Sequence, residues 1–169
     1  ASKEIGLRTF IYFTIGWSAN DAENNPQWCA RSRDGSFVMQ SDSGDSDLNT
    51  SKLPYYYWKF MCINNNYHEL IYDQIEELCK KYQVDGFWFD IYQVYRKCYC
   101  QNCIESMQSL GYDSENPDEV ESHYAYQIKA HCNSLNELIH KYIPAAEIFY
   151  NGTTAIDLGS NFRHSMYEN

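Results

Sequence analysis

The chain has 169 residues, of which 44% are hydrophobic and 17% aromatic, and its formal net charge at pH 7 is −10. This length and composition favour one folded domain, residues 1–169, and exclude an intrinsically disordered chain. The negative charge argues against nucleic acid as a partner, and no apolar run is long enough to span a membrane. Sixteen tyrosines and four tryptophans suit a sugar ligand, because apolar sugar faces pack on flat aromatic rings.

The first two segments of the chain have contrasting patterns. The stretch TFIYFTIG at residues 9–16 is rich in β-branched and aromatic residues, which predicts a buried strand. Residues 18–52 are polar and include the run SDSGDSDLNTSK. So long a polar segment predicts a functional or partly mobile loop.

Residues 67–82 carry the clearest helical pattern, because apolar side chains recur at helical spacing along one stripe. Asn66, with Glu69 three residues later, resembles a capping box at the start of this helix. Residues 86–90, with the sequence GFWFD, then predict a short, fully buried strand that ends on a carboxylate.

A second long helix is predicted over residues 117–142. Pro117 suits the first helical position, two acidic residues occupy the first turn, and Pro144 ends the helix. The sequence EIFYNG at 147–152 predicts a third strand, and FRHSMY at 162–167 is a candidate for a fourth.

Strands and helices therefore alternate along the chain, which is typical of a parallel α/β sheet. Because the predicted strands are too few for a complete barrel, we expect a fragment of a (β/α)8 TIM barrel, about strands 3–6 of it. The single domain would then be an internal portion of a larger catalytic barrel. A small self-contained α/β sheet is the alternative.

Asp90 comes at the carboxyl end of the strand at 86–90, where parallel α/β folds gather their chemistry. Side-chain alternation puts Trp88 and Asp90 on one face of this strand and two phenylalanines on the other. If the first face points to the barrel axis, Asp90 lies at the rim of an active-site cup. Alternatively, Asp90 caps the next turn or pairs with Arg96 or Lys97.

The segment YQVDGFWFDI at 82–91 resembles part of glycoside hydrolase family 29, the α-L-fucosidases and their relatives. GLRTFIYFTIGW at 6–17 is similar to the preceding barrel strand of that group, and Asn151-Gly152 falls where a later strand ends. The likeness covers most of the chain and is closest to fucosidase-like barrel hydrolases in which VDGFWFD is followed by CYCxxC. It implies a hydrolase that acts on a glycan or glycoside, with Asp90 as its nucleophile.

The resemblance implies retaining hydrolysis, in which Asp90 attacks the anomeric carbon and a second carboxyl group serves as acid and then as base. Glu168 is the candidate for this second group because it closes the next strand-like segment; an exposed glutamate without such a role is the alternative. The pair of histidines that binds the sugar in the resembled family is absent from this chain, so the fragment alone is expected to be inactive. A non-catalytic carbohydrate-binding barrel and a zinc-braced interaction module are the alternative functions.

Three of the seven cysteines crowd together as Cys98, Cys100 and Cys103, a spacing that suits a metal better than disulfides. Cys62 is expected to supply a fourth ligand, because its loop and the 98–103 loop should emerge on the same barrel face. The arrangement is similar to one that holds a structural zinc in the family 42 β-galactosidases. We therefore expect structural zinc; free thiols, or three thiolates completed by a His or Asp, are the alternatives.

Further residues are assigned from their position. Trp17 and Trp88 are candidates for the floor of a sugar site, with core packing as the alternative, and Asn151 either binds a sugar hydroxyl or forms a turn. The reduced-cysteine pattern favours a cytoplasmic location, with secreted and periplasmic locations left open. The remaining cysteines are expected to be small buried residues: Cys29, Cys79 and Cys132.

Overall fold

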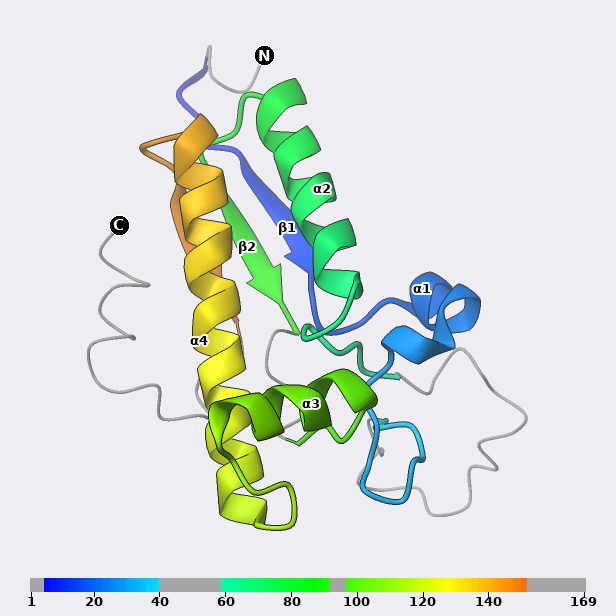
Figure 1. Cartoon of the computed structure of the whole chain (residues 1–169). Coiled ribbons are helices and arrows are strands. Elements are labelled where there is room, and N and C mark those ends of the chain that lie inside the picture. The colour runs from blue at the N-terminus through cyan, green and yellow to red at the C-terminus, as the bar shows by residue number, and fades with distance from the viewer. Residues whose placement is uncertain (1–4, 40–58, 92–96, 152–169) are drawn as a thin grey trace.

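A three-stranded parallel sheet forms the centre of the chain (Figure 1). The computed structural model describes residues 5–39, 59–91 and 97–151. The strands of this part are β1 (Phe10–Thr14), β2 (Gly86–Asp90) and β3 (Glu147–Tyr150), side by side in chain order. The α/β class predicted from the alternation of strands and helices is confirmed.

Helices connect successive strands. Helix α2 (Tyr67–Lys81) lies between β1 and β2 in the chain, while α3 (Gln101–Leu110) and α4 (Pro117–Tyr142) lie between β2 and β3. Figure 1 shows α2 and α4 over the same face of the sheet, where they pack against each other. The short α1 (Ala19–Asn24) and the 3-10 helix η2 (Pro26–Trp28) follow β1. Among the described residues, no helix is both long and apolar enough to cross a membrane.

The two faces of the sheet have different roles. Phe87 and Phe89 of β2 point toward the helices and are fully buried in the core. The opposite face carries a row of aromatic side chains at one register level, Tyr12, Trp88 and Phe149. Tyr12 is 61% exposed and Trp88 is 42% exposed, so this face is open to solvent. The sequence prediction of a fully buried β2 is therefore wrong on the face away from α2 and α4.

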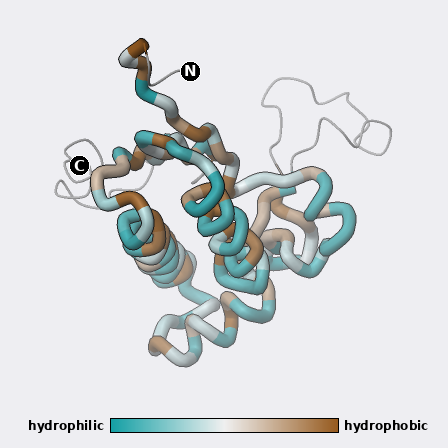
Figure 2. The backbone as a smooth tube through the Cα atoms, turned by 90° about the horizontal axis from the view of Figure 1, so that it is seen from above, coloured by the Kyte–Doolittle hydropathy of each residue, from teal (hydrophilic) through white to brown (hydrophobic). Residues whose placement is uncertain are grey.

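The helices bury one stripe each against the sheet and against one another. In α2 this stripe consists of Tyr67, Ile71, Ile75 and Cys79, as the helical spacing predicted. Figure 2, viewed from above, shows hydrophilic and hydrophobic residues alternating along the helices. The cysteines expected to be ordinary core residues are indeed buried: Cys29, Cys79 and Cys132.

Helix termini agree with the sequence in α4 but not in α2. Pro117 occupies the first turn of α4 and the Asn116 side chain accepts a hydrogen bond from Asp118 N, which caps the helix. The capping box predicted at Asn66 is wrong, since its backbone is already helical and its side chain makes no cap bond. Instead, the Asn65 side chain accepts a hydrogen bond from Tyr67 N at 3.0 Å.

Candidate active site and metal centre

Asp90 is the last residue of the central strand, and its side chain is half-buried. It lies on the same face of β2 as Trp88, two residues earlier, and therefore on the aromatic face away from the helices. Strand β2 delivers it to the carboxyl edge of the sheet, beside the end of β3. The alternation in the sequence predicted this position.

Two side chains from the neighbouring strands hold the Asp90 carboxyl group. The Tyr12 hydroxyl of β1 donates a hydrogen bond to Oδ2. The Asn151 amide, directly after β3, donates to Oδ1 at 2.6 Å. Asn151 itself is fixed by the hydrogen bond of its backbone N–H to the Phe89 carbonyl at 2.7 Å. Each carboxyl oxygen thus has its own donor, one from each flanking strand.

These contacts favour the ionised form of Asp90. Partial burial raises the pKa of the carboxyl group, but hydrogen bonds from Tyr12, Asn151 and the Ile91 backbone together outweigh burial, and the net pKa is lowered. Donation to Asp90 correspondingly raises the pKa of the Tyr12 phenol. The site at neutral pH is therefore a carboxylate that accepts hydrogen bonds from neutral donors.

Tyr12 is a site residue that sequence reasoning missed. The period-two pattern of residues 9–16 places Tyr12 on one face of a strand, but its contact with Asp90 spans 78 positions along the chain. That contact depends on the register of the parallel pair, in which Tyr12 lies opposite Trp88. A local pattern in the sequence does not contain this register.

The other predicted site residues are only partly brought together. Trp88 lies on the Asp90 face and packs on Phe149, with ring centroids 4.1 Å apart. Trp17 is half-buried and forms an antiparallel bridge with Phe60, in the segment that leads to Cys62. Glu168, the candidate acid and base, lies outside the described residues.

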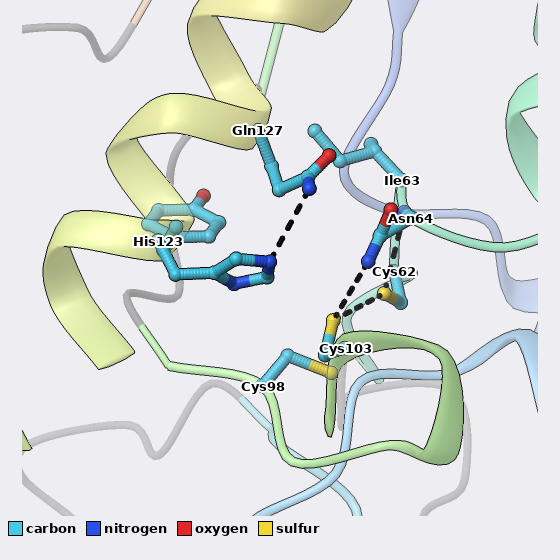
Figure 3. Close-up of a pocket in the computed structure, with 8 residues that line it drawn as sticks. Cys62, Ile63, Asn64, Cys98, Cys103, His123 and Gln127 are labelled. Carbon is cyan, nitrogen blue, oxygen red and sulfur yellow. Dashed lines mark hydrogen bonds between the residues drawn. The ribbon is translucent and has the colours of Figure 1, made fainter. Parts of the chain in front are cut away.

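The four cysteines expected to bind a metal do converge. Cys62 comes from the loop before α2, Cys98 and Cys100 precede α3, and Cys103 lies in the first turn of α3. Their sulfur atoms all lie within 4.8 Å of one another, and all four residues are buried. Figure 3 shows three of them, Cys62, Cys98 and Cys103. Cys62 Sγ is 3.5 Å from Cys103 Sγ and 3.7 Å from Cys100 Sγ. We call these four residues the cysteine cluster.

The dimensions of the cysteine cluster fit a tetrahedral metal site. Metal–sulfur bonds of about 2.3 Å around a tetrahedral ion place neighbouring sulfur atoms about 3.8 Å apart. The observed separations are close to this and far longer than a disulfide bond, and the cysteines are free. Hydrogen bonds within the cluster lower the pKa of Cys98 and Cys100 and raise that of Cys62 and Cys103, so two of the four sulfur atoms favour the thiolate form that binds metals. The cluster could therefore hold a metal ion.

Backbone and side-chain donors surround the sulfur atoms. Arg31 N donates to Cys98 Sγ at 3.5 Å, and Asn64 N donates to Cys62 Sγ at 3.4 Å. The Asn64 amide also donates to Cys103 Sγ at 3.7 Å. Such donors stabilise negative charge on sulfur, so the groups around the four sulfur atoms also suit thiolates bound to a metal.

A small pocket beside the cysteine cluster is lined by His123 and Gln127 of α4, as Figure 3 shows. His123 Nε2 lies 2.9 Å from Ser106 Oγ and 3.2 Å from Gln127 Nε2. Burial lowers the pKa of His123 and keeps its ring neutral. With this nitrogen engaged by Ser106 and Gln127, the four-sulfur set is better supported than three thiolates completed by His123.

Comparison with known proteins gives a family match for the first part of the chain. Residues 1–91, which are 91 of the 169 residues and so just over half, match the family model described as "Hypothetical glycosyl hydrolase 6". No curated protein gives a significant match.

Among solved structures, the chain is similar to alpha-L-fucosidase isoenzyme 2 from Paenibacillus thiaminolyticus, with a TM-score of 0.73 and 26% sequence identity. The match covers 89% of this chain and 21% of that chain, so the present chain spans about a fifth of the length of that fucosidase. The chain belongs to the family of hypothetical glycosyl hydrolases that the matching model describes.

Proposed function

We propose that the chain is an internal portion of the catalytic (β/α)8 barrel of a retaining glycoside hydrolase. Asp90 is the nucleophile, and the substrate is a glycan or glycoside of the α-L-fucoside type. The similarity to a bacterial α-L-fucosidase and the glycosyl hydrolase family match support this class of reaction.

The winding of the sheet supports a barrel. The strands follow one another in chain order, all parallel, and α2 and α4 cover one face. A doubly wound sheet places helices on both faces, whereas a barrel places them outside only and fills its interior with side chains. The row of Tyr12, Trp88 and Phe149 would be part of that interior.

The hydrogen-bonded carboxylate of Asp90 is the observation that carries the proposal. A glycosidase nucleophile has to be ionised, oriented and reachable from the carboxyl end of the strands. Tyr12 and Asn151 bind one oxygen each and lower the pKa of Asp90, and the side chain is only half-buried.

In the proposed mechanism a carboxylate oxygen of Asp90 attacks the anomeric carbon, and the glycosidic bond breaks as a glycosyl ester forms. A second carboxyl group, for which Glu168 is our candidate, protonates the leaving oxygen and then takes a proton from the water that hydrolyses the ester. Retention requires the two carboxyl groups to lie about 5 Å apart. Trp88 would pack on the sugar face, and Asn151 would orient the nucleophile.

The test is hydrolysis of 4-nitrophenyl glycosides, including the α-L-fucoside and the β-galactoside, by the full-length protein that contains this chain. Asp90→Asn keeps the shape of the side chain but removes its charge and one of its two acceptor oxygens, so we expect turnover to fall at least about 1,000-fold. Equal turnover by the wild type and the variant would remove Asp90 from the mechanism.

Two further measurements separate the alternatives. NMR of the first-formed anomer of the sugar product distinguishes retention from inversion, and inversion would contradict a nucleophilic Asp90. Sugar binding without turnover, equal in wild type and Asp90→Asn, would instead indicate a carbohydrate-binding barrel.

We further propose that the cysteine cluster holds Zn²⁺. The four residues that would bind it are Cys62, Cys98, Cys100 and Cys103, and four thiolates leave no coordination position open for water. The ion would therefore be structural, joining the loop before α2 to the start of α3. Metal analysis of the purified protein tests this, since a zinc content near zero in freshly purified protein would contradict it.

A further inference from the structure

Gly16 lies two residues beyond the end of β1, directly after the fully buried Ile15, and both polar groups of its backbone form hydrogen bonds with distant segments. Its N–H donates to the Ile91 carbonyl at 2.8 Å, and its carbonyl accepts from Met61 N at 2.9 Å. Ile91 follows Asp90, and Met61 precedes Cys62. A single buried glycine therefore lies between the candidate nucleophile and a member of the cysteine cluster.

The close approach of Ile91 explains why this position is glycine. A Cβ atom at position 16 would lie 2.0 Å from the Ile91 carbonyl oxygen and 3.2 Å from its carbonyl carbon. Both are backbone atoms, which cannot turn aside as a flexible side chain can. Any other residue at position 16 would push the segment after β2 away from the end of β1.

Ile91 itself has an unfavourable backbone conformation. Its φ angle is +51°, which is rare for a β-branched residue and persists only where surrounding contacts hold it. The Gly16 N–H supplies one such contact, and the hydrogen bond from Ile15 N to the Asp90 carbonyl at 3.1 Å supplies another. The Ile91 backbone N–H also acts on the adjacent Asp90 carboxyl group and lowers its pKa.

We propose that Gly16 is a positioning residue whose peptide group couples the cysteine cluster to the carboxylate of Asp90. The path runs from Cys62 through Met61 to Gly16 and on to Ile91. The metal-bound cluster fixes Met61, Met61 fixes the Gly16 carbonyl, and the Gly16 N–H holds Ile91 in its strained conformation.

Loosening this path has a definite chemical effect. Without the Gly16 contact, Ile91 relaxes to an ordinary negative φ and its N–H turns away from Asp90. The carboxylate then loses the favourable contribution of this N–H to its ionised form, together with part of its orientation. The catalytic consequence rests on the proposed function: displacement of a nucleophile by about 1 Å is expected to lower kcat by up to about 100-fold.

The experiment follows the Asp90 carboxyl carbon by NMR titration in the full-length protein labelled with ¹³C-aspartate, with the signal assigned from its loss in Asp90→Asn. We compare the wild type with Gly16→Ala and with Gly111→Ala. Gly111 is the matched control, because it ends α3 with φ +80° and a Cβ there meets nothing within 4 Å. Gly16→Ala should move the Asp90 titration to higher pH, and Gly111→Ala should leave it unchanged.

Exchange of the native metal for Cd²⁺ provides a milder perturbation that does not depend on whether Gly16→Ala folds. The larger ion expands the cysteine cluster without removing it, so the Asp90 signal should shift in the wild type. An Asp90 titration unchanged in folded Gly16→Ala, or an Asp90 signal unmoved by Cd²⁺, would overturn the coupling.

These readouts do not require a substrate, so they are independent of the proposed function. Turnover of 4-nitrophenyl α-L-fucoside then adds the catalytic comparison, in which Gly16→Ala should lower kcat more than it changes KM. If Asp90→Asn proves fully active while the Asp90 titration still responds to Gly16→Ala, the proposed function fails and the coupling stands. If Asp90→Asn is inactive and the Asp90 titration does not respond to Gly16→Ala, the proposed function stands and the coupling fails.

Discussion

A buried histidine should make the stability of the fold sensitive to mild acid. His131 of α4 is 5% exposed and stacks on Tyr72 of α2, with ring centroids 5.3 Å apart. Burial, with a smaller contribution from the nearby His68, lowers the pKa of His131 to about 3. The imidazole is therefore neutral between the two helices at pH values well above 3.

The size of the effect follows from the difference in pKa between the folded and unfolded states. An unfolded histidine has a pKa of about 6.5, so below that pH the unfolded chain is protonated at this residue. In the folded chain His131 stays unprotonated until the pH approaches about 3. Stability is complete above pH 6.5 and falls by about 1.4 kcal/mol per pH unit below it. Acidification from pH 6.5 to pH 5 thus removes about 2 kcal/mol, a large part of a typical unfolding free energy.

The assay is urea unfolding at pH 7.5 and pH 5.0, above the ordinary pKa range of carboxyl groups. We expect the wild type to lose about 2 kcal/mol more than His131→Gln over this interval, since glutamine does not titrate. Ile128→Val, at a fully buried position of the same helix, is the control: it should cost about 1 kcal/mol at both pH values. Equal losses for the wild type and His131→Gln would refute the reasoning.

Three other predictions concern the carboxylate, the cysteine cluster and the sheet. Tyr12→Phe removes a hydrogen-bond donor to Asp90, so the pKa of Asp90 should rise and the acidic side of the pH profile of kcat/KM should move to higher pH. An unchanged pH profile would contradict the role of Tyr12. Cys98→Ser should lose bound zinc while Cys79→Ser retains it, and equal zinc in the two variants would exclude Cys98 as a ligand. Gly86→Ala would put a Cβ atom 2.1 Å from the Glu147 carbonyl oxygen, so we expect a loss of about 1–3 kcal/mol in urea unfolding, which an unchanged midpoint would disprove.

Elements with strong local signals were predicted to the residue. Helix α4 runs over 117–142 and β2 over 86–90, as expected, because proline and two acidic residues begin the helix and an apolar run defines the strand. Helix α2 ends one residue earlier than predicted, at Lys81. The predicted strands at 9–16 and 147–152 are shorter in the structure, because alternation alone does not mark where strand pairing stops.

Short helices with ambiguous sequences were missed. Helix α3 has 10 residues, and its cysteines suggested a metal loop rather than a helix, although Gly111 with φ +80° marks its end. The six-residue α1 lies in the predicted loop at 18–52 and is capped by Ser18. Helices this short gain little from propensity and depend on tertiary contacts.

The candidate site was predicted as far as chain order determines it. Asp90, Asn151 and the cysteine cluster follow from the rule that carboxyl ends of parallel strands meet at one edge. The contacts of Tyr12 with Asp90 and of Gly16 with Ile91 depend on strand register and backbone conformation across more than seventy positions, which a linear pattern does not contain.

The solvent-facing strip of aromatic rings on the sheet has a consequence for handling the protein. Water solvates such a strip poorly, so two copies of residues 1–169 expressed alone gain free energy by pressing their Tyr12 and Trp88 faces together. We expect the isolated chain to self-associate through this face. In the proposed barrel this face would be covered, so expression as part of the full-length protein should prevent the self-association.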